Sequence, residues 1–106
     1  MIQTFGKRED GDWVEARGQI RRLLADDEDD GESHQRFVVT LPGGQTLLIA
    51  HNTEVAERIP LGLADRVRFR GLYVYNDSGG VVHFTHRDPH GREAGGWVEF
   101  RGKRYS

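Results

Sequence analysis

Alternating apolar and polar residues mark out short strands along most of this chain. From Trp13 to Leu24 the side chains alternate in character, as they do in a strand with one buried face. Leu23 and Leu24 break the alternation and Gly18 has no side chain, so this strand is predicted to contain a bulge or a sharp bend. Further strands are predicted at 35–41, 45–51, 66–75 and 81–86, followed by a hairpin of two short strands at 96–100 and 103–105.

Two segments carry helical signals. Asn52 can cap the start of a helix, Glu54 suits its positive end, and Pro60 would stop it after about two turns. The pattern therefore predicts one short helix over residues 52–59. A short helical turn is also predicted over residues 2–8.

The order of the predicted elements favours one fold class. Three strands, a short helix and two strands follow one another as in the OB-fold, a five-stranded Greek-key barrel. With 106 residues the chain fits one domain. We therefore predict a single all-β domain over residues 1–106, with one short helix, built as an OB-like barrel plus a C-terminal hairpin. A small sandwich or another partly open barrel is the alternative.

Composition narrows the possible chemistry. The chain has no cysteine, which excludes disulfides and thiolate zinc sites. The net charge is −2, and the acidic run at 26–30 predicts a solvated loop that repels anions. Basic residues of the kind that bind nucleic-acid backbones are limited to two small groups. These groups are Arg66, Arg68 and Arg70 in one strand, and Arg101, Lys103 and Arg104 in the final hairpin.

No segment is predicted to cross a membrane. The longest apolar run, residues 47–50, is far shorter than the ~20 residues of a spanning helix. The first residues lack the basic start and long apolar core of a signal peptide. A cytoplasmic location is therefore expected for the chain as written, and an exported one if a leader has been trimmed from it.

Polar side chains suited to chemistry concentrate between residues 83 and 92. Three of the five histidines lie there, at the end of a predicted strand. We expect them to join residues from the other strands in one polar pocket of a small binding module. The predicted ligand-binding residues are His34, His51, Asn52, His83, His86, Asp88, Arg92 and Trp97. In this hypothesis the histidines and Asn52 hydrogen-bond a ligand of open identity, Arg92 neutralises an anionic group, and Trp97 closes the apolar side.

A divalent metal site is the second interpretation of the same segment. His83 and His86 are three residues apart, so in a regular strand they would point to opposite faces. His86, Asp88 and His90 are better placed, because Asp88–Pro89 predicts a turn that can fold these side chains together. His86 and His90 would then be ligands, and Asp88 a ligand or the base of a metal-assisted hydrolase. The plainer interpretation is that Asp88 caps the turn and His90 is solvated.

Other functions have less support in the sequence. The chain offers no cysteine nucleophile and its serines have no elbow motif around them, so no catalytic residue is assigned and an enzyme is less expected than a binding module. Apart from the possible divalent metal, no cofactor is predicted. Single-stranded nucleic-acid binding is a further alternative, although Tyr73 and Tyr75 follow the register of the core. The last alternative is a protein-interaction adaptor that uses sheet edges and the acidic loop.

Two runs of the chain are distinctive enough to compare with known families. Residues 44–52 end in Ala-His-Asn, and residues 79–86 end in His-Phe-Thr-His. Together with Asp88–Pro89 and Gly95–Trp97, they resemble an uncharacterised bacterial family, the domain of unknown function DUF3465. The resemblance extends from about residue 2 to Tyr105. It implies a fold and the location of a site, and it implies no activity.

The chain departs from the pattern of this family at three positions. Relatives often have histidine where Arg87 and Glu93 stand, and they tend to have tryptophan where Phe84 stands. The resemblance therefore implies that a metal site built on those histidines would be incomplete here. Many relatives also resemble exported proteins with a signal peptide.

Overall fold

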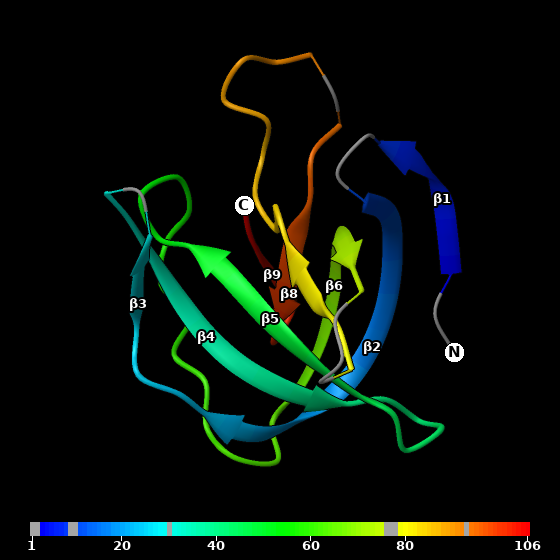
Figure 1. Ribbon diagram of the computed structural model, residues 1–106. Coiled ribbons are helices and arrows are strands. Elements are labelled where there is room, and N and C mark those ends of the chain that lie inside the picture. Colours follow the sequence, from blue (N-terminus) through cyan, green and yellow to red (C-terminus); the bar gives the residue numbers. More distant parts are fainter. Residues whose placement is uncertain (1–2, 9–10, 30, 76–78, 93) are drawn as a thin grey trace.

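The chain forms one continuous β-sheet, drawn in Figure 1. The computed structural model describes residues 3–8, 11–29, 31–75, 79–92 and 94–106. The strands are β1 (Gln3–Arg8), β2 (Gly11–Leu23), β3 (Asp27–Asp29), β4 (Glu32–Thr40), β5 (Thr46–Asn52), β6 (Arg66–Val74), β7 (Val81–His83), β8 (Trp97–Phe100) and β9 (Lys103–Tyr105). These residues contain no helix, so the predicted all-β class is confirmed without its short helix. Within this described part, no helix is long and apolar enough to cross a membrane.

β2 is shared between two neighbours. Its first part pairs with β6 from Asp12 to Gln19, and its last part pairs with β4 as far as Leu23. β4 continues to β5 in an antiparallel pair, β5 to β7 in a parallel pair, and β7 to β6 in an antiparallel pair. The order β2–β4–β5–β7–β6 therefore leads back to β2. Figure 1 shows how strongly β2 and β4 curve along this path.

A bulge and a glycine let β2 change neighbours. The register with β4 shifts between Ile20 and Arg22, which agrees with the bulge predicted for this strand. At Gly18 the end of β4 comes so close that a Cβ atom would lie 2.7 Å from the carbonyl oxygen of Thr40. A side chain at this position would push the two strands apart, so the close approach requires glycine.

The main hydrophobic core lies on the inward faces of the central strands. Phe37 and Val39 on β4, and Leu47 and Ile49 on β5, are at most 1% exposed, and the residues between them are partly exposed. This period of two is the one predicted from the sequence. Each fully buried side chain of this size stabilises the fold by about 1.5–3 kcal/mol through the hydrophobic effect.

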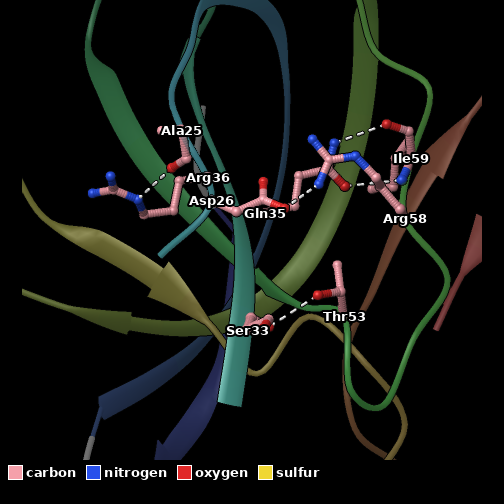
Figure 2. Close-up of polar contacts among 8 residues, drawn as sticks. All are labelled: Ala25, Asp26, Ser33, Gln35, Arg36, Thr53, Arg58 and Ile59. Carbon is pink, nitrogen blue, oxygen red and sulfur yellow. Dashed lines mark hydrogen bonds and ion pairs between the residues drawn. The ribbon is translucent and has the colours of Figure 1, made fainter. Parts of the chain in front are cut away.

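The helix predicted over residues 52–59 is replaced by turns. The backbone carbonyl of Asn52 does accept the N–H of Ala56, at 3.0 Å, as it would in a first helical turn. Further on, the side-chain amide of Gln35 donates to the carbonyl of Ile59 and accepts its N–H, both at 2.8 Å (Figure 2). A distant side chain therefore takes the backbone groups that a continuing helix would use, and the prediction is wrong.

The helical turn predicted over residues 2–8 is also wrong. Residues Gln3–Arg8 form β1, and residue 2 lies outside the described residues. β1 pairs with β2 between Gly11 and Glu15, where β4 does not reach. The N–H and C=O groups of that edge are available there, and a strand satisfies them whereas a helical turn would not.

Two strands end earlier than predicted. β6 ends at Val74, so Tyr75, expected on the core face beside Tyr73, is 74% exposed. β7 ends at His83 because the next residue, Phe84, has a left-handed backbone with φ of 59°. This break ends the side-chain alternation that a longer strand would have had.

The predicted C-terminal hairpin is confirmed as β8 and β9. β8 pairs with β6 between Arg68 and Arg70, which extends the sheet on that side. The turn between the two strands contains Arg101 and Gly102, with φ of 52° and 79°. Two successive left-handed residues of this kind match the right-handed twist of the flanking strands.

Candidate functional site

The segment after β7 builds a cleft of about 300 Å³ beside the ends of β4 and β5. In a regular strand His83 and His86 would face opposite sides, but the left-handed Phe84 between them rotates the chain. Both histidines consequently line the same cleft. The lining residues are Glu32, His34, Asn52, Val55, His83, Phe84, His86, Asp88, Pro89 and His90.

Six side chains singled out from the sequence thus share one cleft, and three others do not. Those brought together are His34, Asn52, His83, His86, Asp88 and His90. His51, Arg92 and Trp97 are absent from the lining. Four lining residues had no place in the sequence hypothesis: Glu32, Val55, Phe84 and Pro89.

His86 is the most buried histidine of the cleft lining, with 6% of its surface exposed. Its Nδ1 lies 2.6 Å from the carbonyl oxygen of Arg87. A carbonyl can only accept, so Nδ1 carries the proton and donates, and in the neutral ring Nε2 is left with its lone pair. The ring also stacks on Phe84, with centroids 4.6 Å apart and planes 25° apart, which fixes its orientation.

The second ring nitrogen of His86, Nε2, is free to accept a hydrogen bond in a side chain that lines the cleft. In the described part of the chain Nε2 has no hydrogen-bond partner. Every fully buried side-chain nitrogen or oxygen in that part does have one. Nε2 therefore keeps some exposure to solvent. Burial lowers the pKa of His86, while the hydrogen bond to the Arg87 carbonyl and the charge of Glu32 raise it, and the charges of Arg87 and His34 lower it. The net direction is downward, so this imidazole is a neutral acceptor at neutral pH.

His51 is a structural residue beneath the cleft. It is completely buried, with Nε2 at 3.2 Å from the carbonyl oxygen of Glu57 and Nδ1 at 2.8 Å from the Thr85 hydroxyl. Nε2–H donates to the carbonyl, so Nδ1 accepts from the hydroxyl. Burial lowers the pKa of His51 to about 4. Both ring nitrogens are engaged in these two bonds, which tie β5 to two loops.

Asp88 lies at the cleft but its carboxylate organises the turn. One oxygen accepts the N–H of His90 at 3.0 Å and the other accepts the N–H of Arg92 at 2.8 Å. These bonds hold the loop that closes one side of the cleft. Among the residues that the structure describes, no group of three or more histidine or carboxylate side chains is placed to hold a metal ion. Glu93 lies outside the described residues.

Glu32 and Asn52 form the opposite wall. The Asn52 side-chain amide donates to Glu32 at 2.8 Å, and its oxygen accepts the N–H of Glu54 at 2.8 Å. Asn52 pairs with His34 across β4 and β5, so the strand register places these two beside each other. The lining carries two carboxylates and neither lysine nor arginine, so at neutral pH it is negatively charged.

Arg92 and Trp97 lie elsewhere. Arg92 is exposed, and it contacts Asp88 through its backbone N–H. Trp97 is half-buried on β8, with the guanidinium carbons of Arg104 and Arg68 at 4.1 Å and 5.8 Å from its ring centroid. The apolar surface of the cleft comes from Val55, Phe84 and Pro89, whereas Trp97 had been expected to supply it.

Comparison with known proteins yields one match. Residues 1–106 match a family described as Protein of unknown function (DUF3465). Neither the curated proteins nor the solved structures contain a match to this chain.

Proposed function

The chain belongs to the DUF3465 family, which has no assigned function, and we propose that it is a small binding module whose histidine-lined cleft takes a cationic hydrogen-bond donor. A primary amine or a guanidinium group is the ligand chemistry that fits best. The observation that carries this proposal is the unpaired, neutral Nε2 of His86, a side chain that lines the cleft.

We propose further that the scaffold is a single OB-like Greek-key barrel. The order of pairings that returns to β2 supports this assignment, as does the parallel pair between β5 and β7. In this view β2, β4, β5, β6 and β7 are the five barrel strands. β1, β3, β8 and β9 are additions at its margins, and the cleft lies where β4, β5 and β7 meet the loop after Phe84.

The acceptor character of the cleft is the first argument for a donating ligand. Nε2 of His86 is held in place by the bond from Nδ1 to Arg87 and by the stack on Phe84. Nε2 keeps contact with solvent, so a ligand N–H would replace water there, and such a bond contributes about 0.5–1.5 kcal/mol net. A primary amine or a guanidinium group supplies this N–H, whereas a carboxylate ligand offers Nε2 no hydrogen.

Charge is the second argument. The carboxylates of Glu32 and Asp88 favour a cation over an anion in the same space. Val55, Phe84 and Pro89 add apolar surface that can contact the methylene groups of an alkyl amine or guanidine. The volume of about 300 Å³ suits a small ligand or the end of a larger one.

Ring-detected NMR of ¹⁵N-histidine tests this proposal. Titration with methylguanidinium or ethylammonium is expected to shift the Nε2 signal of His86, and acetate is expected to leave it unchanged. His86→Phe keeps an aromatic ring stacked on Phe84 and removes the acceptor, so it should abolish the shifts at the remaining cleft histidines. Arg92→Ala, outside the cleft lining, is the matched control and should bind as the unchanged protein does. Equal responses to the cations and to acetate would contradict the proposed ligand class.

A further inference from the structure

A second groove, separate from the histidine cleft, lies where β2 and β6 meet the β8–β9 turn and the end of β4. Its volume is about 670 Å³, and it shares no lining residue with the cleft. The lining residues are Arg17, Gly18, Gln19, Thr40, Leu41, Pro42, Arg66, Val67, Arg68, Glu99, Arg101 and Gly102. We call this the arginine groove.

The groove concentrates positive charge in a chain whose net charge is −2. Four arginines line it, against the single carboxylate of Glu99. That carboxylate forms ion pairs with two guanidinium groups. Its Oε1 lies 3.5 Å from Nη1 of Arg68, and its Oε2 lies 3.4 Å from Nε of Arg104. Among the described residues Arg17, Arg66 and Arg101 form no ion pair, so three of the four lining arginines keep an uncompensated charge.

Two of these arginines are placed against each other. Arg17 on β2 lies directly opposite Arg68 on β6. Like charges opposite one another in a sheet are destabilising, by a few tenths of a kcal/mol to about 1 kcal/mol. An anion between the two guanidinium groups would turn this repulsion into two favourable contacts.

A third arginine of the groove, Arg101, has a backbone conformation that arginine rarely adopts. Arg101 is left-handed, with φ of 52°, in a turn where asparagine or glycine is the usual residue. Its charge therefore enters the groove at a conformational cost of about 1 kcal/mol. Its guanidinium lies 5.1 Å from the centroid of the Phe100 ring, a contact that leaves the positive charge uncompensated and available to an anionic ligand.

We propose that the arginine groove binds the sugar–phosphate backbone of a single-stranded nucleic acid. Positive charges from β2, β6 and the β8–β9 turn form a track along which successive phosphates can lie. On β8, two residues before Glu99, the half-buried ring of Trp97 has the guanidinium of Arg104 over its face. A base that displaces Arg104 from this face would stack on the ring, as unpaired bases do on aromatic side chains beside basic grooves. The acidic run, predicted as a loop, contains strand β3, which among the described residues pairs with β4 and does not join the sheet next to β6 or β8.

Salt-dependent binding of a fluorescein-labelled oligothymidylate, followed by anisotropy, tests the proposal. Three phosphate contacts predict a slope of log K against log salt of about −2, since each contact on a single strand contributes about −0.7. Arg17→Gln and Arg66→Gln should each weaken binding severalfold and reduce the slope by about 0.7. Arg22→Gln removes an exposed charge from the same strand, outside the groove, and is the matched control.

Arg101→Asn separates binding from folding. Asparagine suits the left-handed turn, so this variant should melt no lower than the unchanged protein and still bind the oligonucleotide severalfold more weakly. Three results would overturn the proposal. They are no retention of the oligonucleotide at low salt, an equal loss of binding in Arg22→Gln, and competition by inorganic phosphate as effective as competition by the unlabelled strand.

Discussion

The hydroxyl of Thr85 lies 2.8 Å from Nδ1 of His51, deep under the candidate site. Both side chains are completely buried, and they come from segments 34 residues apart. This bond joins β5 to the segment that carries His83 and His86. The position of the segment that lines the cleft therefore depends on a fully buried contact.

Removing the Thr85 hydroxyl should destabilise the protein without changing its shape. Thr85→Val leaves Nδ1 of His51 buried without a donor, which costs about 1–3 kcal/mol. Urea unfolding measures the loss. Thr53→Val provides the comparison, because the Thr53 hydroxyl donates to the Ser33 carbonyl at a partly buried position and its loss should cost less. An equal loss of stability in both variants would contradict the larger contribution expected from the hydrogen bond between Thr85 and His51.

Acid should weaken the fold between pH 6.5 and about 4. Burial lowers the pKa of His51 from 6.5 to about 4, so below pH 6.5 the unfolded chain binds a proton that the native state does not. The stability present above pH 6.5 therefore falls as the pH drops, and His51 alone accounts for about 3 kcal/mol of the fall. Burial also lowers the pKa of His86, which acts in the same direction.

Unfolding by urea at a series of pH values measures this dependence. Carboxylates contribute to it as well, so the informative quantity is the difference in slope between the unchanged protein and His51→Gln. The slope should be shallower in that variant and unaltered in His90→Ala, whose residue is exposed. Identical slopes in all three proteins would show that His51 is not held neutral by its burial.

Two glycines should respond very differently to a single added methyl group. A Cβ at Gly96 would lie 2.2 Å from the carbonyl oxygen of Phe84 and 2.3 Å from that of Arg70. Gly96→Ala must therefore displace the segment that lines the cleft, with an expected loss above about 2 kcal/mol. At Gly43 nothing lies within 4 Å, so Gly43→Ala should change stability by no more than about 0.5 kcal/mol. A shift in the cleft histidine NMR signals should accompany only the first variant.

Gln35 should be essential to the loop after β5. Its amide satisfies both the N–H and the carbonyl of Ile59, so Gln35→Leu leaves two backbone groups without partners and should cost about 2–4 kcal/mol. Arg36→Gln is the matched change on the neighbouring residue, whose exposed side chain donates to the carbonyl of Ala25 at 3.1 Å (Figure 2). It should cost less than about 1 kcal/mol. Hydrogen exchange at the Ile59 amide would separate the two variants, since only Gln35→Leu removes its acceptor.

The parts of the fold that were predicted correctly are those determined by residues close together in the sequence. The inward positions of Phe37 and Val39 follow from the period of two, and the bulge in β2 follows from the broken alternation near Leu23. The helix after Asn52 was predicted wrongly because its cap is local but the partner that ends it, Gln35, is not. Local propensity cannot register a hydrogen bond from a residue 24 positions away.

For the candidate site, the sequence held more information than was used. His51 shares the inward face of β5 with Leu47 and Ile49, so the same period of two indicated that it would be buried under the site. The turn that pairs Thr40 with Thr46 also fixes the pairing of His34 with Asn52. The joint placement of His83 and His86 was not predictable in this way, because it depends on the left-handed backbone of Phe84.

The sharing of β2 has a consequence for how the chain acquires its structure. Asp12 pairs with Tyr73 and Gln19 with Arg66, so one partner of β2 is synthesised long after β2 itself. Hairpins such as β4–β5 can assemble early, but one edge of β2 stays open until β6 leaves the ribosome. Contacts this remote along the polypeptide slow folding, and an open edge invites pairing with other chains. Expression yield should therefore respond more to changes that delay the β2–β6 pairing than to changes within the β4–β5 hairpin.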